Sequence, residues 1–196
     1  MALCHQPTPI EAMVRLSEHL GGPSLFIKRD DCTGLATGGN KTRKLEFLVG
    51  EALTEHADML VTQGAVQSNH VRQTAAAACR AGLKCHALLE RRVPDRDASY
   101  EETGNVFLDK VFGATMEFRP SGLDMNAEAM AVTEKLRAEG HRPYFIPGGG
   151  SNAGNEIGPV AFRAQLLGDR HGFGIHVEAA GAELHGGAED LVEEYV

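Results

Sequence analysis

Strand and helix patterns alternate along most of the chain, and this alternation restricts the folds open to it. Short apolar runs such as Met59-Leu60-Val61 predict buried strands, and each is followed by apolar residues at helical spacing. The expected strands cover residues 58–63, 84–90, 114–118 and 143–146, and the expected helices cover residues 41–56, 69–81, 100–112 and 124–139. Such alternation favours an α/β fold of open parallel sheets with helices on both faces and right-handed crossovers.

The two ends of the chain continue this pattern less regularly. An amphipathic helix is expected to end at Leu20, before Gly21-Gly22-Pro23, and residues 25–27 are a candidate short strand. Another helix is expected from Ser151 to about Leu167, followed by a segment rich in Gly, His and Glu. Its histidines have spacings that fit no standard ligand set, so no metal site is predicted for His171, His176 and His185 with Glu178 and Glu183.

Composition excludes several classes of partner. The 196 residues carry 27 acidic and 19 basic side chains, a formal net charge of −8, which argues against nucleic acid or an anionic membrane. No apolar run approaches the ~20 residues that span a bilayer, and the N-terminus has no secretory pattern. The four cysteines lack paired spacing and are interpreted as reduced thiols. We therefore expect a cytoplasmic protein.

The first candidate site lies in the segment from Thr37 to Leu48. Gly38 and Gly39 permit a tight turn and a close approach of the backbone to a ligand. Asn40 is a suitable helix N-cap, which places Lys41 in the first turn of a helix. A cation there opposes the helix dipole at a cost of ~0.3–1 kcal/mol, and the same field favours the neutral amine that a reactive lysine needs. The alternative is a solvated surface lysine.

The second candidate site lies in the segment from Thr62 to Ala76, where an apolar strand leads through small polar residues into an alanine-rich helix. This order is how α/β folds present backbone N–H groups to an anion. Ser68 and Asn69 stand at or near the N-cap, and capping alone would account for one of them. A hydrolase pair of Ser68 with His70 is disfavoured, because residues two apart on a helix do not face each other.

Together, in this order and separation, the two segments resemble the PLP-dependent enzymes of the tryptophan-synthase-β fold type. Within that type they are similar to the branch holding 1-aminocyclopropane-1-carboxylate deaminase, D-cysteine desulfhydrase and L-cysteate sulfo-lyase. The sequences of these segments are most similar to those of D-cysteine desulfhydrase and L-cysteate sulfo-lyase. The resemblance extends over roughly the first four-fifths of the chain and includes residues 27–35, 104–106, 119–140 and 146–152.

The resemblance implies pyridoxal 5′-phosphate as cofactor, attached to Lys41, with the freed amine of Lys41 acting as general base on the substrate Cα. It implies that Asn69 hydrogen-bonds the ring oxygen of the cofactor. The substrate carboxylate would be held by Ser68 and by the backbone N–H groups of Asn69 and His70 at the helix N-terminus.

Three cations near these segments have roles that are left open. Arg43 or Arg72 could face a sulfonate, and Lys44 could be a second amine near the cofactor. A surface position is the preferred interpretation for each. Likewise, Gly148-Gly149-Gly150-Ser151-Asn152 resembles a substrate loop that connects two lobes more than a phosphate cradle.

The implied reaction is α,β-elimination from a small sulfur-containing amino acid. L-Cysteate would give pyruvate, sulfite and ammonia, and D-cysteine would give pyruvate, sulfide and ammonia. The alternatives are deamination of 1-aminocyclopropane-1-carboxylate and a non-catalytic, truncated remnant of the family. A homodimer is the assembly that the resemblance implies.

The same resemblance implies a two-lobed molecule. Residues 1–40 would begin the large lobe, residues 41–151 would form the small lobe, and residues 152–196 would be a partial, divergent end of the large lobe. The family has a Gly/Ser/Thr-rich phosphate loop after a strand in this last part, whereas Glu178-Ala179-Ala180-Gly181-Ala182 stands here. We therefore expect the large lobe to be incomplete.

Overall fold

The computed structural model describes residues 1–150. These residues fall into two compact units. One unit holds Met1–Thr8 together with the described residues from 30 onward, and the other holds Pro9–Arg29. The lobe boundaries predicted from the sequence, at residues 40 and 151, remain a proposal.

The smaller unit is a two-stranded antiparallel ribbon with one short helix. Strand β1 (Ile10–Ala12) pairs with β2 (Phe26–Lys28), and Ile10 lies opposite Lys28. Helix α1 (Val14–Leu20) connects the two strands. The sequence predicts the helix and the second strand. It does not predict β1, because the partner that makes this short segment a strand lies beyond the helix.

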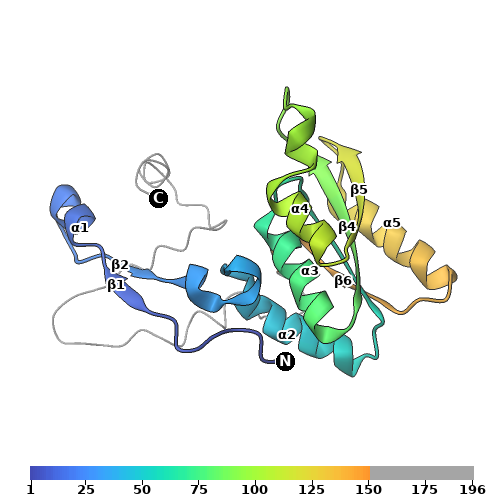
Figure 1. Cartoon of the computed structure of the whole chain (residues 1–196), viewed down its shortest axis with the longest axis horizontal. Helices are drawn as coiled ribbons and strands as arrows, with labels where there is room; N and C mark the ends of the chain where they lie inside the picture. Colours follow the sequence, from blue (N-terminus) through green and yellow to red (C-terminus); the bar gives the residue numbers. More distant parts are fainter. Residues whose placement is uncertain (151–196) are drawn as a thin grey trace. The chain divides into compact units, whose positions relative to one another are not determined.

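The larger unit is organised around a parallel sheet of four strands, which is drawn in Figure 1. Its strands are β3 (Met59–Ala65), β4 (Lys84–Arg91), β5 (Thr115–Pro120) and β6 (Pro143–Ile146). The spatial order is β5-β4-β3-β6, and every neighbouring pair is parallel. The predicted open parallel sheet is therefore confirmed.

Helices cover both faces of this sheet, as predicted (Figure 1). One face packs against α2 (Lys41–Thr54), α3 (Asn69–Ala81) and α4 (Gly104–Val111), while α5 (Met125–Ala138) covers the other. Successive strand residues alternate between the two faces. In β6, Ile146 packs in the cluster with α2 and α3, whereas Phe145 packs with α5.

Most predicted element boundaries agree with the structure to within two residues, and α3 agrees at both ends. The expected helix over residues 100–112 is an exception. It is divided into a 3₁₀ turn (Ala98–Glu101) and α4. The interruption falls next to Gly104, whose φ of 60° is left-handed and does not continue a right-handed helix.

Several predictions concern residues outside the described range. They are the helix from Ser151 to about Leu167, the substitute for the phosphate loop at residues 178–182, the histidine-rich segment and the incomplete large lobe. Among residues 1–150, no helix has the length and apolar character to cross a bilayer.

Candidate functional site

The predicted site residues gather where β3 and β6 end and where α2 and α3 begin. Lys41 is the first residue of α2. Ser68 is the residue before α3 and follows β3 after a short turn. The carboxyl edge of a parallel sheet is where α/β folds bind ligands, and both candidate segments lead into it.

Lys41 is buried, with only 7% of its surface exposed. Its Nζ donates a hydrogen bond to Asn40 Oδ1 at 3.3 Å. The solvated surface lysine is therefore the wrong interpretation for this residue. Asn40 occupies the N-cap position as predicted, but its side chain accepts no backbone N–H, so the predicted capping bond is wrong.

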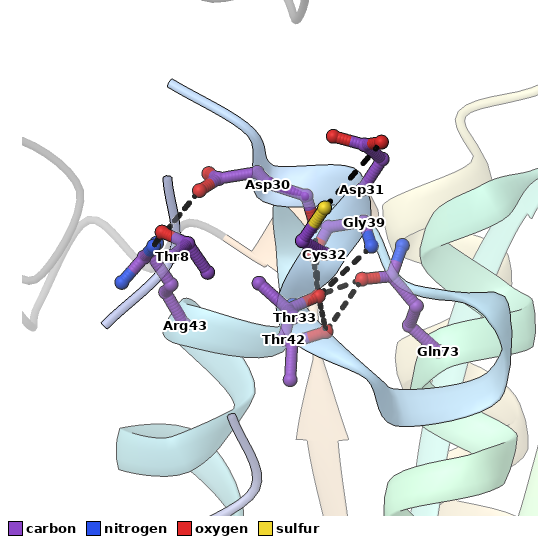
Figure 2. Close-up of polar contacts among 9 residues, drawn as sticks. All are labelled: Thr8, Asp30, Asp31, Cys32, Thr33, Gly39, Thr42, Arg43 and Gln73. Carbon is purple, nitrogen blue, oxygen red and sulfur yellow. Dashed lines mark hydrogen bonds and ion pairs between the residues drawn. The ribbon is translucent and has the colours of Figure 1, made fainter. Parts of the chain in front are cut away.

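The helix that carries Lys41 is capped from another helix. Figure 2 shows the Gln73 amide of α3 beside the first turn of α2. The backbone N–H of Thr42 donates to Gln73 Oε1 at 2.9 Å, and the Thr42 hydroxyl donates to the same oxygen at 3.0 Å. Gln73 is fully buried. It thus supplies the acceptor that Asn40 does not.

The two glycines before Lys41 allow close packing, but the close neighbours are protein atoms. Gly38 has φ 81°, and a Cβ there would lie 1.7 Å from the carbonyl oxygen of Asp31. Gly39 has φ 136°, and its Cβ would lie 2.4 Å from Gln73 Nε2. The sequence predicts the tight turn correctly, and the expected close approach of this backbone to a ligand stays a prediction.

Two backbone donors are available at the start of α3. Ser68 is the N-cap, and its Oγ accepts from the N–H of Val71 at 3.3 Å. The N–H groups of Asn69 and His70 have no hydrogen-bond partner among the described residues. Asn69 is exposed, and its side chain makes no hydrogen bond within the same range. Unpaired donors at a helix N-terminus suit an anion such as a carboxylate.

The His70 side chain turns away from this opening and is buried, with 3% exposed. Its Nε2 lies 2.9 Å from Thr62 Oγ1. Because the Thr62 hydroxyl donates its only proton to the carbonyl of Ile146 at 2.9 Å, Nε2 must be the donor to Thr62. His70 is therefore the Nε2–H tautomer, and Nδ1 is left as a buried acceptor without a partner in the described chain.

Burial, and after it the positive charges of Lys41 and Lys44, together lower the pKa of His70 to about 3, although the Pro147 carbonyl opposes the shift. The ring is thus neutral at neutral pH. Since it faces Thr62, a nucleophile–base pair of Ser68 with His70 is excluded.

The glycine segment after β6 packs against the same site. Lys44 Nζ donates to the carbonyl of Gly149 at 3.3 Å. A Cβ on Gly150 would lie 3.5 Å from Lys44 Cδ and 3.6 Å from His70 Cε1. Lys44 is therefore half-buried beside His70 and is not the surface cation that the sequence favours.

Arg43 and Arg72 are not the solvated surface cations that the sequence favours either. Arg43 binds Asp30 at 2.9 Å and the hydroxyl of Thr8. Arg72 donates to the carbonyl of Gly38 at 2.9 Å and to Thr37. Both guanidinium groups therefore fasten the loop that leads to Lys41, and neither is an unengaged cation ready to receive a sulfonate.

The structure brings Lys41 close enough to His70 for the charge of the amine to act on the ring, and Gln73 links the start of α2 to Asn69. Sequence reasoning missed Gln73 and Thr62. The available signal was a polar residue within the alanine-rich part of α3, but nothing local identifies its partner.

Among residues 1–150, no group of three or more His, Cys, Asp or Glu side chains is arranged to hold a metal ion.

Known proteins share both the sequence and the fold of this chain. A D-cysteine desulfhydrase of Klebsiella pneumoniae subsp. pneumoniae is 50% identical over 160 residues, which are 82% of this chain and 48% of the relative. A D-cysteine desulfhydrase of Salmonella typhi is 48% identical over 167 residues, or 85% of this chain and 51% of the relative. The chain thus spans about half the length of the curated relatives it matches.

Among solved structures, an ACC deaminase homologue superposes with a TM-score of 0.67 at 39% identity, over 76% of this chain and 44% of the other. An O-ureido-L-serine synthase superposes with a TM-score of 0.53 at 18% identity, over 73% of this chain and 42% of the other, which is a likeness of fold alone. The model of the pyridoxal-phosphate dependent enzyme family matches residues 1–168. The chain belongs to the family of pyridoxal-phosphate dependent enzymes.

Proposed function

We propose that this chain carries the cofactor-attachment and carboxylate-binding half of a PLP-dependent carbon–sulfur lyase. The observation that carries the proposal is a buried lysine at the start of α2 together with two backbone donors at the start of α3 that are unpaired within residues 1–150. An amine for covalent attachment and an anion site for an amino acid carboxylate are the two elements that such chemistry needs from this region.

The described residues fit the cofactor in part. Lys41 supplies a buried primary amine beside the neutral ring of His70. The exposed side-chain amide of Asn69 makes no hydrogen bond within residues 1–150, as expected of a residue that would hydrogen-bond the ring oxygen. In the family the cofactor phosphate is held by a Gly/Ser/Thr-rich loop, where this chain has Glu178-Ala179-Ala180-Gly181-Ala182.

Bound PLP would act as the electron sink for loss of the β-substituent. Lys41 would attach the cofactor and, once released by the substrate, take the proton from the substrate Cα. The N–H groups of Asn69 and His70, with the Ser68 hydroxyl, would hold the substrate carboxylate and so orient the Cα–H bond toward the Lys41 amine. Burial of Lys41 would keep water away from that proton transfer.

The proposed substrate is D-cysteine, which gives pyruvate, sulfide and ammonia with one water consumed. The 50% and 48% identity to D-cysteine desulfhydrases supports this choice. L-Cysteate is the other substrate of the same class. Binding of its sulfonate would need a cation, but the guanidinium groups of Arg43 and Arg72 are already hydrogen-bonded to Asp30 and to the carbonyl of Gly38.

Deamination of 1-aminocyclopropane-1-carboxylate is the second candidate, favoured by the 39% identity to an ACC deaminase homologue. Release of 2-oxobutyrate from that compound would distinguish it from the lyase, which releases pyruvate. A non-catalytic remnant is the third. A cytoplasmic location, a homodimer and the lobe boundaries remain predictions from the sequence.

The test begins with the visible absorbance of the purified chain after addition of PLP. Borohydride reduction and peptide mass mapping then locate the attached cofactor. We expect it on Lys41, with pyruvate released from D-cysteine, and we expect Lys41→Ala to lose both. Lys110→Ala is a matched control, because Lys110 is an exposed lysine of α4.

A label distributed over surface lysines, or pyruvate release that survives in Lys41→Ala, would reject the proposed role of this residue. A melting temperature unchanged by PLP would favour the remnant, since a ligand that binds the native state raises it.

A further inference from the structure

We propose that Gln73 is a positioning residue that fixes Lys41 relative to the anion-binding end of α3. The inference rests on the proposed function, because it assigns Gln73 a role through Lys41. Its amide bridges the two helices: Oε1 accepts from Thr42, the neighbour of Lys41, and Nε2 donates to the carbonyl of Asn69 at 3.0 Å. We call this amide and its two partners the Gln73 bridge.

The bridge has only one chemically consistent orientation. The backbone N–H of Thr42 can only donate, so it needs the oxygen of the amide, and the Thr42 hydroxyl donates to the same oxygen. The carbonyl of Asn69 is an acceptor and needs the NH₂ group. Rotating the amide by half a turn would set donor against donor and acceptor against acceptor. In a fully buried side chain such mispairing is costly, so the bridge holds its two partners at a defined separation.

The bridge is the centre of a larger polar network around the start of α2, drawn in Figure 2. Thr33 Oγ1 lies 3.2 Å from Thr42 Oγ1, and the N–H of Gly39 donates to Thr33 Oγ1 at 3.0 Å. The single proton of the Thr33 hydroxyl is directed to the carbonyl of Asp30 at 2.9 Å or of Gly39 at 3.0 Å, so no donor is assigned between Thr33 and Thr42. Thr33 thus holds the loop before Lys41 together, and its hydroxyl lies against the Thr42 hydroxyl that donates to Gln73.

Packing adds a steric reason for the same conclusion. A Cβ on Gly39 would lie 2.4 Å from Gln73 Nε2, so the Gln73 amide rests directly on the backbone that precedes Lys41. Lys41 lies between Gly39, which packs against the Gln73 amide, and Thr42, which donates two hydrogen bonds to it. Gln73 therefore contacts the backbone on both sides of Lys41. The other bond of the Thr42 N–H, to the carbonyl of Gly39, is longer at 3.3 Å.

The first experiment measures hydrogen exchange of the Thr42 amide in the protein without PLP. In Gln73→Met, which keeps a similar volume but no amide, we expect exchange to accelerate by about tenfold, the equivalent of one hydrogen bond. Thr133→Val is the matched control, because it removes another buried hydrogen bond, from Thr133 Oγ1 to the carbonyl of Ala129, in α5. Unchanged Thr42 exchange in Gln73→Met would overturn the bridge.

The second experiment follows the pH at which the absorbance of Lys41-bound PLP changes. Gln73→Glu keeps an acceptor for Thr42 but places a carboxylate beside the start of α2. We expect this pH to rise in Gln73→Glu, because a negative charge stabilises the protonated nitrogen, while Thr42 exchange stays near the wild-type rate. An unchanged pH would show that residue 73 lies too far from the Lys41 nitrogen to act on it, and that result would overturn the positioning role.

The two proposals fail differently. If the wild-type protein attaches no PLP at Lys41, the proposed function is rejected, whereas the exchange rates of Thr42 still decide whether the bridge exists. If the wild-type protein attaches PLP at Lys41 and Gln73→Met does so equally fast and selectively, the proposed function stands and the positioning role of Gln73 is rejected.

Discussion

Asp109 provides the sharpest test of the electrostatics inside this fold. It lies in α4 with 0% of its surface exposed, and neither carboxylate oxygen has a hydrogen-bond partner among the described residues. Burial raises the pKa of Asp109 to about 7, and the charge of Arg72 opposes this only in part. The buried carboxylate in turn contributes, after burial itself, to raising the pKa of the Cys85 thiol to about 12.

The expected effect on stability follows from proton linkage. An unfolded aspartate has a pKa of about 3.9, so the folded state retains the Asp109 proton to higher pH. The contribution of Asp109 to stability is therefore complete below about pH 4 and is lost as the pH rises to about 7. The total loss is about 4 kcal/mol, of which about 2–3 kcal/mol falls between about pH 5 and pH 8.

Asp109→Asn removes this titration at nearly constant volume. We expect the variant to gain about 2–3 kcal/mol on the wild type between about pH 5 and pH 8. The measurement is the free energy of unfolding in urea, followed by circular dichroism at both pH values. Asp95→Asn is the control, because Asp95 is exposed and the same charge is removed. A difference between Asp109→Asn and wild type that is the same at both pH values would refute the reasoning.

Two further predictions concern the loop before Lys41 and the ring of His70. Gly38→Ala should lower the melting temperature more than Gly82→Ala: both glycines have φ values that disfavour a side chain, 81° and 72°, but only the Cβ at position 38 would meet a carbonyl oxygen, that of Asp31, whereas position 82 has open space. Equal losses would contradict the close packing at Gly38. Nitrogen chemical shifts of His70 should report the neutral Nε2–H tautomer from pH 8 down to about pH 4, since its pKa is lowered to about 3. A ring that titrates near the ordinary pKa of about 6.5 would contradict its burial beside Lys41 and Lys44.

The amino-acid sequence determined the elements whose signals are local. The limits of α3 follow from Ser68 at the N-cap and from Gly82, whose left-handed φ of 72° ends the helix. Asp124 likewise begins α5 by accepting from the N–H groups of Asn126 and Ala127. Because caps and stops act within one helical turn, a single sequence contains them in full. The parallel sheet followed from the alternation of these elements.

The sequence also placed Lys41 and Ser68 at helix starts, but it did not show what surrounds them. Asn40 has the right residue type for a cap, yet the capping oxygen comes from Gln73, on a different helix. Similarly, nothing near His70 in the sequence indicates that its ring will turn toward Thr62. These choices depend on which side chains the packed sheet brings together.

Tertiary structure therefore decided the burial of Lys41, the capping of its helix and the tautomer of His70. The physical reason is distance along the chain. A buried donor or acceptor must be satisfied by whatever group packing places within reach, and that group is often separated from it by most of a domain. Local sequence determined most of the helices and strands, with β1 as an exception, while the packing of α2 and α3 on one face of the sheet decided which polar groups meet.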